Sequence, residues 1–134
     1  LEICLTYLDY TLIDQSAAEG IFPAAREHGV GVILASVFGM GLLTGLEPDP
    51  QDERRKYAGR DREPVAHRMW AWCRQRDLQI RHLAMQFCLA APIDGIAMAG
   101  PCNRAQVEAA HEAATATVAP EVWAQFRAEF GVGQ

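Results

Sequence analysis

Residues 30–45 read VGVILASVFGMGLLTG, an almost unbroken apolar run that gives way to a loop rich in glycine. An apolar run without alternation is typical of a strand buried on both faces, as in a parallel sheet covered by helices. The first polar side chain of the run is Ser36, and Gly39, Gly41 and Gly45 follow it. In parallel α/β folds, ligands lie at the loops that follow the carboxyl ends of strands. The segment therefore predicts a core strand that leads into a binding loop.

The composition is that of one globular domain, and we expect residues 1–134 to form a single domain without an internal boundary. Half of the residues are hydrophobic and 22% are charged, with a net charge of −5. No basic face is therefore available to neutralise the phosphates of a nucleic acid. The sequence shows no signal peptide and no apolar run of the roughly 20 residues that cross a membrane. We expect a cytoplasmic protein that binds neither nucleic acid nor membrane.

The cysteine and histidine residues show no metal-ligand spacing. The four cysteines are far apart, without a Cys-x-x-Cys pair, and the four histidines form no cluster with them. Such cysteines among apolar neighbours are typical of buried, reduced thiols in a cytosolic protein. The sequence therefore predicts reduced, buried thiols and no metal site. The cysteines are Cys4, Cys73, Cys88 and Cys102, and the histidines are His28, His67, His82 and His111.

The first 36 residues predict a strand, a helix and a second strand. Residues 1–5 are apolar and indicate a strand, and residues 17–28 indicate a helix. This helix is expected to end at Gly29, because glycine readily adopts the left-handed conformation that closes a helix. The second strand covers residues 31–36. Because few residues link these elements, they predict a βαβ unit with parallel strands.

The middle of the chain combines a long polar segment with two helices. Residues 46–60 contain two prolines and many charges, and two interpretations stay open: a functional loop and a plain surface insertion. Asp61 is expected to cap the next helix, with Pro64 in its first turn. A second helix covers about residues 81–90. The apolar stripe of the first helix is expected in the core; it consists of Val65, Met69, Trp72 and Cys73.

The last part of the chain predicts a third strand and two more helices. The strand covers residues 95–99, and Asn103 with Gln106 resembles a capping box at the start of a helix. The final helix is expected from Pro120 to Gly131. The sum is an α/β arrangement of three parallel strands, each followed by at least one helix. Both edges of this sheet are open to pairing, which predicts marginal stability or self-association.

The ends of the second and third strands share features that bind anions in other folds. Ser36 and a glycine loop follow one strand, and Gly100 and the helix start at Asn103 follow the other. Backbone N–H groups in such loops and at helix N-termini converge on anions. In β/α barrels, the loops after the last two strands often bind phosphate. The glycine spacing is not that of a Rossmann fold, and helix capping without a ligand explains Asn103 equally well.

Several segments share a pattern with a known family. The most specific is ASVFGMGLLTG at residues 35–45, and GVGVI at residues 29–33 precedes it. Supporting matches are YTLIDQS at residues 10–16, Ala84-x-Gln86-Phe87, Gly100 followed by Gln106-Val107, and Trp123. Over essentially its whole length, the chain resembles the aldo-keto reductase superfamily. It is closest to the sugar dehydrogenases, those resembling L-galactose dehydrogenase and L-fucose or D-threo-aldose dehydrogenase.

The resemblance implies part of a (β/α)8 TIM barrel: about the last three β/α units plus a C-terminal helix. It implies an NAD(P)-dependent oxidoreductase that transfers a hydride between the nicotinamide and an aldose or other carbonyl substrate. The catalytic Asp, Tyr, Lys and His of the family lie on earlier strands, so we place no catalytic residue in this chain. The missing N-terminal half of the barrel is then its partner, and we expect the 134 residues alone to be inactive.

The resemblance also implies a cofactor site at the two strand ends. The loop after the second strand would line the pyrophosphate and nicotinamide; its residues are Ser36, Phe38, Gly39 and Met40. The start of the later helix would cover the adenosine end; its residues are Gly100, Asn103, Arg104 and Gln106.

The adenosine end departs from the family pattern. Gly100 and Gln106 stand where NADP-specific members carry basic residues that bind the 2′-phosphate. Ala109 and Ala110 stand where other members contact adenine, and Arg104 offers the positive charge there. These departures favour NAD over NADP, or weak binding altogether.

A second hypothesis belongs to a different class. The chain would be a non-catalytic half-barrel that binds a nucleotide or pairs its open edges with another chain. The alanines at positions 109 and 110 are the residues that favour it.

Overall fold

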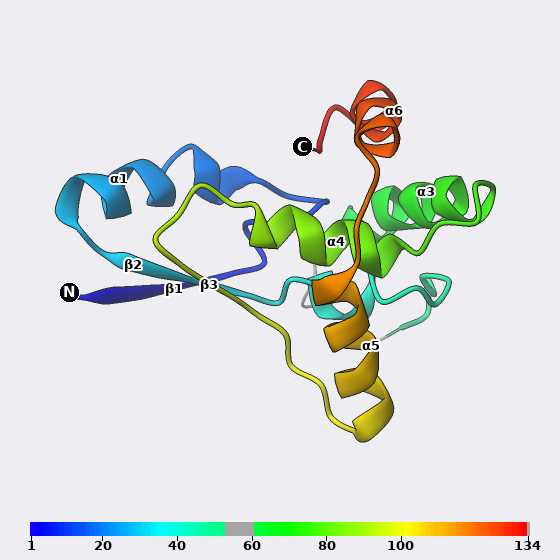
Figure 1. The fold of residues 1–134 in the computed structure, drawn as a ribbon, viewed down its shortest axis with the longest axis horizontal. Coiled ribbons are helices and arrows are strands. Elements are labelled where there is room, and N and C mark those ends of the chain that lie inside the picture. The colour runs from blue at the N-terminus through cyan, green and yellow to red at the C-terminus, as the bar shows by residue number, and fades with distance from the viewer. Residues whose placement is uncertain (53–60, 134) are drawn as a thin grey trace.

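The computed structural model describes residues 1–52 and 61–133. Each strand of the described part of the chain is followed by one or more helices (Figure 1). In chain order they are β1 (Ile3–Tyr7), η1 (Ser16–Ala18), α1 (Ile21–His28), β2 (Gly31–Ala35), η2 (Gly39–Gly41), α3 (Arg62–Arg74), α4 (Ile80–Leu89), β3 (Gly95–Met98), α5 (Arg104–Thr115) and α6 (Pro120–Phe130), where η marks a 3-10 helix. The sequence thus folds as an α/β protein, as predicted.

The three strands form a parallel sheet with β2 in the centre. In the register, Leu5 lies opposite Ile33, and Ile33 lies opposite Ile96. Parallel neighbours joined through α1 confirm the predicted βαβ unit, because a parallel pair needs a crossover connection. Within residues 1–52 and 61–133, both outer strands leave one edge without a partner strand.

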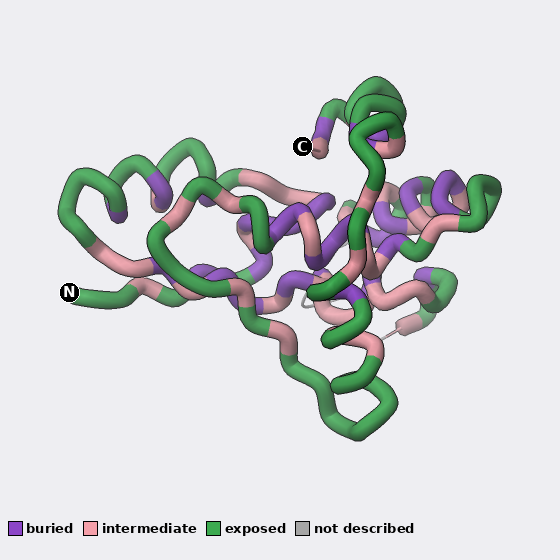
Figure 2. The backbone as a smooth tube through the Cα atoms, in the orientation of Figure 1, coloured by how far each residue is buried: buried purple, intermediate pink, exposed green. Residues whose placement is uncertain are grey.

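One face of the sheet is covered by helices. Figure 1 shows α1 and α4 on the same side of the strands, whereas α5 lies beyond their carboxyl ends. Thr6, Val32 and Leu34 point to the covered side and are buried. In Figure 2 the buried backbone runs through the centre of the molecule, around α4. Val32 and Leu34 are part of a larger apolar core whose burial stabilises the fold.

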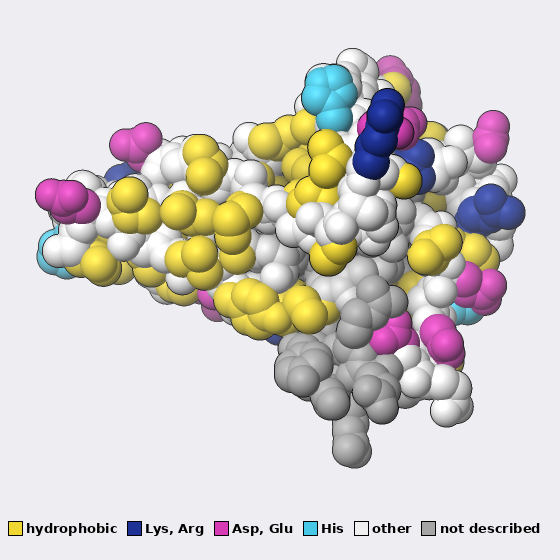
Figure 3. Space-filling view, turned by 90° about the horizontal axis from the view of Figure 1, so that it is seen from below, with side chains coloured by type: hydrophobic (Ala, Val, Ile, Leu, Met, Phe, Trp, Pro, Cys, Tyr) yellow, Lys and Arg dark blue, Asp and Glu magenta, His cyan; other side chains and the backbone are white. Residues whose placement is uncertain are grey.

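The opposite face of the sheet is open. Ile3, Leu5 and Tyr7 on β1 and Ile96 and Met98 on β3 are all exposed, although most are purely apolar. Figure 3 views the molecule from this side and shows hydrophobic side chains gathered over the strands. We call this surface, formed by alternate residues of the three strands, the open face.

Three aromatic side chains anchor the loop after β1 to the core. The ring of Tyr10 lies 4.7 Å from that of Phe22 on α1 and 4.9 Å from that of Phe87 on α4. Burial raises the pKa of the Tyr10 hydroxyl, with a further contribution from Cys88. The segment that follows β1 is therefore partly core.

A second aromatic cluster attaches the last helix to α3. The ring of Trp72 meets that of Phe126 edge-on at 5.3 Å, and the guanidinium of Arg76 lies 4.1 Å from the Trp72 ring centre. Within the predicted α3 stripe, Met69, Trp72 and Cys73 are buried and Val65 is half-buried. The stripe is core, as predicted.

The helix ends follow the sequence signals in most cases. Gly29 and Gly131 close α1 and α6 in the left-handed conformation, with φ of 63° and 71°. Asn103 caps α5, because its side chain accepts a hydrogen bond from the N–H of Gln106. Asp61 precedes α3 as predicted, but its side chain makes no capping hydrogen bond. Its backbone is already helical there, so its carboxylate is not placed to receive the first N–H groups.

Several predicted boundaries were wrong by one or more residues. The first strand is Ile3–Tyr7 rather than residues 1–5, because pairing with β2 continues to Tyr7 opposite Ala35. The strand predicted at 31–36 stops at Ala35, since Ser36 has a φ of 62°. The helix predicted at 17–28 is divided at Gly20 into η1 and α1.

Two further element boundaries and the predicted burial of the cysteines also differ from the structure. The strand predicted at 95–99 ends at Met98, and the helix predicted at about 81–90 is Ile80–Leu89. Two of the thiols expected to be buried are not. Cys102 lies in the segment between β3 and α5 and is exposed, and Cys4 lies on the outer strand β1 and is half-buried. Residues 53–60 of the predicted loop 46–60 lie outside the described residues.

Candidate functional site at the carboxyl edge of the sheet

The last paired residues of the three strands form one row across the sheet. Tyr7 lies opposite Ala35, and Ala35 lies opposite Met98. Residues paired in this way point to the same face, so this row is the outermost row of the open face. Immediately beyond it, Leu8 and Ser36 have φ of 64° and 62°, and the chain turns away from the sheet. The predicted cofactor loop begins at this edge.

The loop at residues 36–41 is built from consecutive tight turns. Ser36, Gly39, Met40 and Gly41 all have positive φ, a conformation that glycine adopts at little cost and other residues adopt with strain. The N–H of Gly39 donates to Ser36 O at 2.8 Å, and the N–H of Gly41 donates to Phe38 O at 3.1 Å. These two glycines therefore shape the loop, and their N–H groups are already engaged within it.

The structure brings two of the four predicted loop residues together with a third residue. The Tyr7 hydroxyl donates to Met40 Sδ at 3.0 Å, and the Ser36 hydroxyl lies 4.0 Å from the same sulfur. Phe38 instead packs against the core, and Gly39 is buried beside Ile13. The sequence prediction did not include Tyr7 among the residues beside this loop. Strand alternation at Ile3, Leu5 and Tyr7 is the signal that could have placed it on this face.

The second predicted region is the N-terminus of α5. Asn103 Oδ1 accepts from the N–H of Gln106 at 3.0 Å, and Gln106 Oε1 accepts from the N–H of Cys102 at 2.7 Å. This is the expected reciprocal capping, with the return bond one residue before the usual position. Arg104 is exposed, and its Nε lies 2.7 Å from Glu108 Oε1. A side chain at Gly100 would meet no atom within 4 Å, so the backbone there is open to approach.

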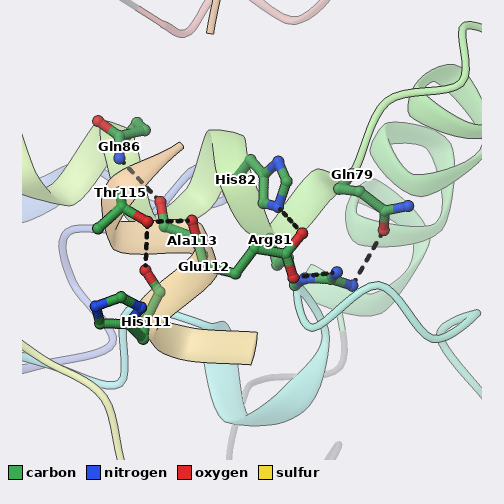
Figure 4. A network of polar contacts seen from close by, with 8 residues as sticks. All are labelled: Gln79, Arg81, His82, Gln86, His111, Glu112, Ala113 and Thr115. Carbon is green, nitrogen blue, oxygen red and sulfur yellow. Dashed lines mark hydrogen bonds and ion pairs between the residues drawn. The ribbon is translucent and has the colours of Figure 1, made fainter. Parts of the chain in front are cut away.

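A polar network joins α5 to α4 behind this region (Figure 4). Glu112 Oε2 pairs with Arg81 at 2.9 Å, and Glu112 Oε1 lies 3.2 Å from His82 Nε2. The hydrogen bond and charge of Arg81, assisted by His82, lower the pKa of Glu112. Gln86 Nε2 donates to the last-turn carbonyls of Ala113 and Ala114 at 2.9 and 3.0 Å. The network fixes the position of α5 on the helical layer.

The loop that starts at Ser36 is connected to the same network at its far end. A Cβ added to Gly45 would lie 3.3 Å from an Arg81 guanidinium nitrogen, and φ at Gly45 is 104°. Trp70 Nε1 also donates to Gly45 O at 3.1 Å. Gly45 is thus held between α3 and α4, which anchors the loop that starts at Ser36.

The segment after β1, the third strand end at this edge, is also fixed. Arg62 donates to Leu8 O at 3.1 Å and pairs with the carboxylate of Asp14. Partial burial acts to raise the pKa of Asp14, but hydrogen bonds from Ser16 and the charge of Arg62 outweigh it and lower the pKa. All three segments at the carboxyl edge are therefore tied to the helical layer.

A separate hollow lies at the opposite, amino edge of the sheet. Its volume is about 390 Å³, and Phe22, Arg26, Val32 and Asp94 are among its lining residues. Arg26 donates to Pro92 O across it at 3.1 Å. The hollow contains none of the predicted site residues, so it does not bear on the dinucleotide prediction.

Residues 1–52 and 61–133 contain neither a metal centre nor a membrane-spanning helix. No group of three or more His, Cys, Asp or Glu residues in these ranges could hold a metal ion. No helix there is both long and apolar enough to cross a membrane. Burial raises the pKa of the Cys73 and Cys88 thiols to about 12, so both are protonated and unreactive at neutral pH.

Comparison with known proteins relates this chain to one enzyme family. The model of the Aldo/keto reductase family matches residues 1–129. The chain is 32% identical over 127 residues to a D-threo-aldose 1-dehydrogenase of Pseudomonas sp, which covers 93% of this chain and 38% of that protein. It is also 32% identical over 111 residues to an L-galactose dehydrogenase of Arabidopsis thaliana, covering 81% and 32% of the two chains. The chain thus spans about a third of the length of these curated relatives.

Proposed function

Because this chain belongs to the aldo/keto reductase family, we propose that residues 1–134 are the C-terminal part of one (β/α)8 barrel domain. The complete protein would be an NAD(P)-dependent oxidoreductase of that family. Two relatives that are named as sugar dehydrogenases support an aldose as the substrate. The chain itself would supply one wall of the cofactor site and no catalytic acid or base.

The observation that carries this proposal is the open face. Leu5, Ile33 and Ile96 form one apolar row across the three strands, and Tyr7, Ala35 and Met98 form the next. In a closed barrel, such rows stack into layers that fill the interior, and no strand edge stays unpaired. Further strands would bury this face and pair both open edges.

The residues at the carboxyl edge fit a dinucleotide by their chemistry. Ser36 and Tyr7 offer hydroxyl groups beside the loop. The N-terminus of α5 offers the positive end of a helix for a pyrophosphate, with open space at Gly100. Gly39 and Gly41 would act by shaping the loop, since their N–H groups bond within it.

The same residues support NAD over NADP. Arg104 is the cation predicted at the adenosine end, and it already pairs with Glu108. A 2′-phosphate would compete with that carboxylate for the guanidinium. Gly100 and Gln106 add no positive charge there.

When bound, the cofactor would supply hydride transfer to or from the substrate carbon. The residues of this chain would bind and orient the dinucleotide at the carboxyl edge. The apolar rows of the open face would exclude water from that region. The proton that accompanies the hydride would be handled by groups outside these residues.

The test compares the 134-residue chain with the complete protein from which it comes. Reduction of NAD during aldose oxidation is followed by absorbance, with NADP as the second cofactor. We expect turnover by the complete protein, preferentially with NAD, and none by the 134 residues alone. Turnover by the isolated chain, or a complete protein that neither binds nor reduces either cofactor, would contradict the proposal.

The second candidate function is a non-catalytic half-barrel that binds a nucleotide or another chain. Its supporting observation is the pair of open edges on β1 and β3, which could accept a strand from a partner. Size measurement of the isolated chain during an NAD titration separates the two functions. A monomer that binds no NAD would argue against the module.

A further inference from the structure

Arg81 lies between the two segments that we expect to bind the cofactor. Its Nη2 donates to Glu112 Oε2 on α5 at 2.9 Å, and its Nη1 donates to Gln79 Oε1 at 3.1 Å (Figure 4). The same Nη1 would lie 3.3 Å from a Cβ added at Gly45, where the loop that starts at Ser36 ends. One guanidinium group therefore meets both the end of the loop and α5.

The loop itself is firmly held by other contacts. The N–H of Leu43 donates to Phe38 O at 3.0 Å, and the Leu43 side chain is fully buried. Trp70 on α3 donates to Gly45 O at 3.1 Å. The loop thus keeps its shape and its place on the helical layer through contacts that do not involve Arg81.

Helix α5, in contrast, is held near one of its ends. Within the described residues, its polar contacts with α4 involve Glu112, Ala113 and Ala114 in its last turns. Residues 104–108 at the other end are all exposed. About 9 Å of helix separates Glu112 from Gln106, since each residue adds roughly 1.5 Å. A small rotation at the attached end therefore moves the N-terminus of α5 relative to the loop.

The position of Arg81 is unfavourable for its own helix. Arg81 is the second residue of α4, which has no acidic residue in its first turn, and the positive end of the helix dipole disfavours a cation there. Its Nε is buried and has no hydrogen-bond partner in residues 1–52 and 61–133. Departures from local rules of this kind are expected at functional sites. The contacts of Arg81 with other segments therefore explain its presence better than the stability of α4 does.

We propose that Arg81 is a positioning residue, which sets the N-terminus of α5 against the loop at residues 36–45. This inference rests on the proposed function, in which the loop lines the pyrophosphate and nicotinamide and α5 covers the adenosine end. A ligand that bridges two segments gains its full affinity only when their separation matches its own length. Arg81 would act on the cofactor indirectly, through Gly45 and Glu112.

The test compares the whole dinucleotide with one of its halves on the complete protein. Dissociation constants are measured for NADH and for AMP, which carries the adenosine end alone. R81M should weaken NADH binding about tenfold and leave AMP binding within about twofold of the wild type, because α5 itself stays intact. A general loss of folded protein would weaken both ligands by the same factor. The ratio of the two constants therefore separates positioning from a merely structural role.

A second variant, R81K, covers the case in which R81M does not fold. Lysine keeps the positive charge but lacks the planar fork of donors. Its ammonium should still pair with Glu112 and keep the melting temperature near that of the wild type, whereas it cannot also fill the space beside Gly45. We therefore expect NADH binding to weaken relative to AMP binding in R81K as well. Wild-type relative binding in R81K would overturn the inference, because charge alone would then be sufficient.

Arg76 provides the matched control. Its Nη1 donates to Trp72 O at 3.2 Å, and its guanidinium lies 4.1 Å from the Trp72 ring centre. These contacts involve neither the loop nor α5. R76M should therefore lower the melting temperature through lost packing, without changing the binding of NADH relative to AMP.

A double variant tests whether Arg81 and Glu112 act as one bridge. E112A should weaken NADH relative to AMP as R81M does, and R81M/E112A should weaken it no further, because both changes break the same contact. Additive effects of the two changes, or wild-type relative binding in R81M, would overturn the inference and leave the proposed function intact. A complete protein that binds neither NADH nor AMP would overturn both.

Discussion

The two faces of the three-stranded sheet differ in what covers them. Thr6, Val32 and Leu34 on one face are buried under helices of the same chain. Leu5 and Ile96 on the other face are 54% and 60% exposed, although they are as apolar as the residues behind them. The apolar pattern of these strands is therefore typical of strands that are buried on both faces. Within the described residues, this chain provides the covering for one face.

This difference shows that an apolar pattern predicts that a face is buried. It does not predict which part of the protein covers that face. A continuous apolar strand is expected whenever both faces are to be buried, whether by nearby helices or by more distant strands. Exposed apolar area on this scale indicates a surface that associates with further protein.

The largest effect is expected from a cavity on the covered face. L34A removes a fully buried side chain and should lower the free energy of unfolding by about 3 kcal/mol. L5A on the open face should lower the free energy of unfolding of the isolated chain by less than about 1 kcal/mol, because Leu5 is already largely exposed. Urea denaturation of both variants measures the two values.

The same pair, repeated in the complete protein, sharpens the comparison. If further strands bury the open face, the cost of L5A should rise to the roughly 2 kcal/mol or more that is typical of core truncations. An L5A cost that stays small in the complete protein would show that the open face remains exposed there. That result would contradict the partial-barrel proposal.

Much of the covered face could be predicted from the sequence. The apolar run before Ser36 gave the central strand, and the periodicity at Met69, Trp72 and Cys73 gave a buried helix face. Both signals are local, because burial of a strand or helix leaves its mark on neighbouring residues. The caps at Gly29 and Asn103 were equally predictable, since each depends on a few adjacent residues.

The site could be predicted only in outline. Ser36 and Met40 were expected, but the contact of Met40 with Tyr7 joins residues on two strands and depends on the register. The first strand was placed two residues early, which removed Tyr7 from the sheet. The engagement of Gly39 and Gly41 N–H groups within the loop depends on backbone geometry that glycine spacing alone does not define.

A smaller effect is expected from a side chain added between two strands. A Cβ at Gly95 would lie 1.8 Å from the backbone oxygen of Val32, the residue paired with it. The backbone of Val32 cannot shift without disturbing the β2–β3 pairing. G95A should therefore lower the free energy of unfolding by about 2 kcal/mol. Gly100 is the control, because an added Cβ meets nothing within 4 Å, and G100A should be nearly neutral. Equal midpoints for the two variants in urea would contradict this reading of the strand contact.

The smallest effect concerns how the helical layer of the covered face responds to pH. The hydrogen bond and charge of Arg81 lower the pKa of Glu112 in the folded state from its ordinary value of 4.5. A carboxyl group with a depressed folded pKa stabilises the protein above its unfolded pKa, and this contribution is lost as the pH falls through the folded pKa. E112Q should therefore lower the melting temperature slightly at neutral pH and reduce its decline below about pH 4.5.

Glu108 gives the matched control for this change. It lies on the same helix, α5, and pairs with Arg104 across one turn, without joining α5 to another helix. Exposed pairs of this kind contribute little to stability, so E108Q should melt at the wild-type temperature at neutral pH. A larger loss for E108Q than for E112Q would show that the contact between α4 and α5 does not depend on Glu112. If E112Q retains the full acid-range decline, the pKa of Glu112 is not what couples this layer to pH.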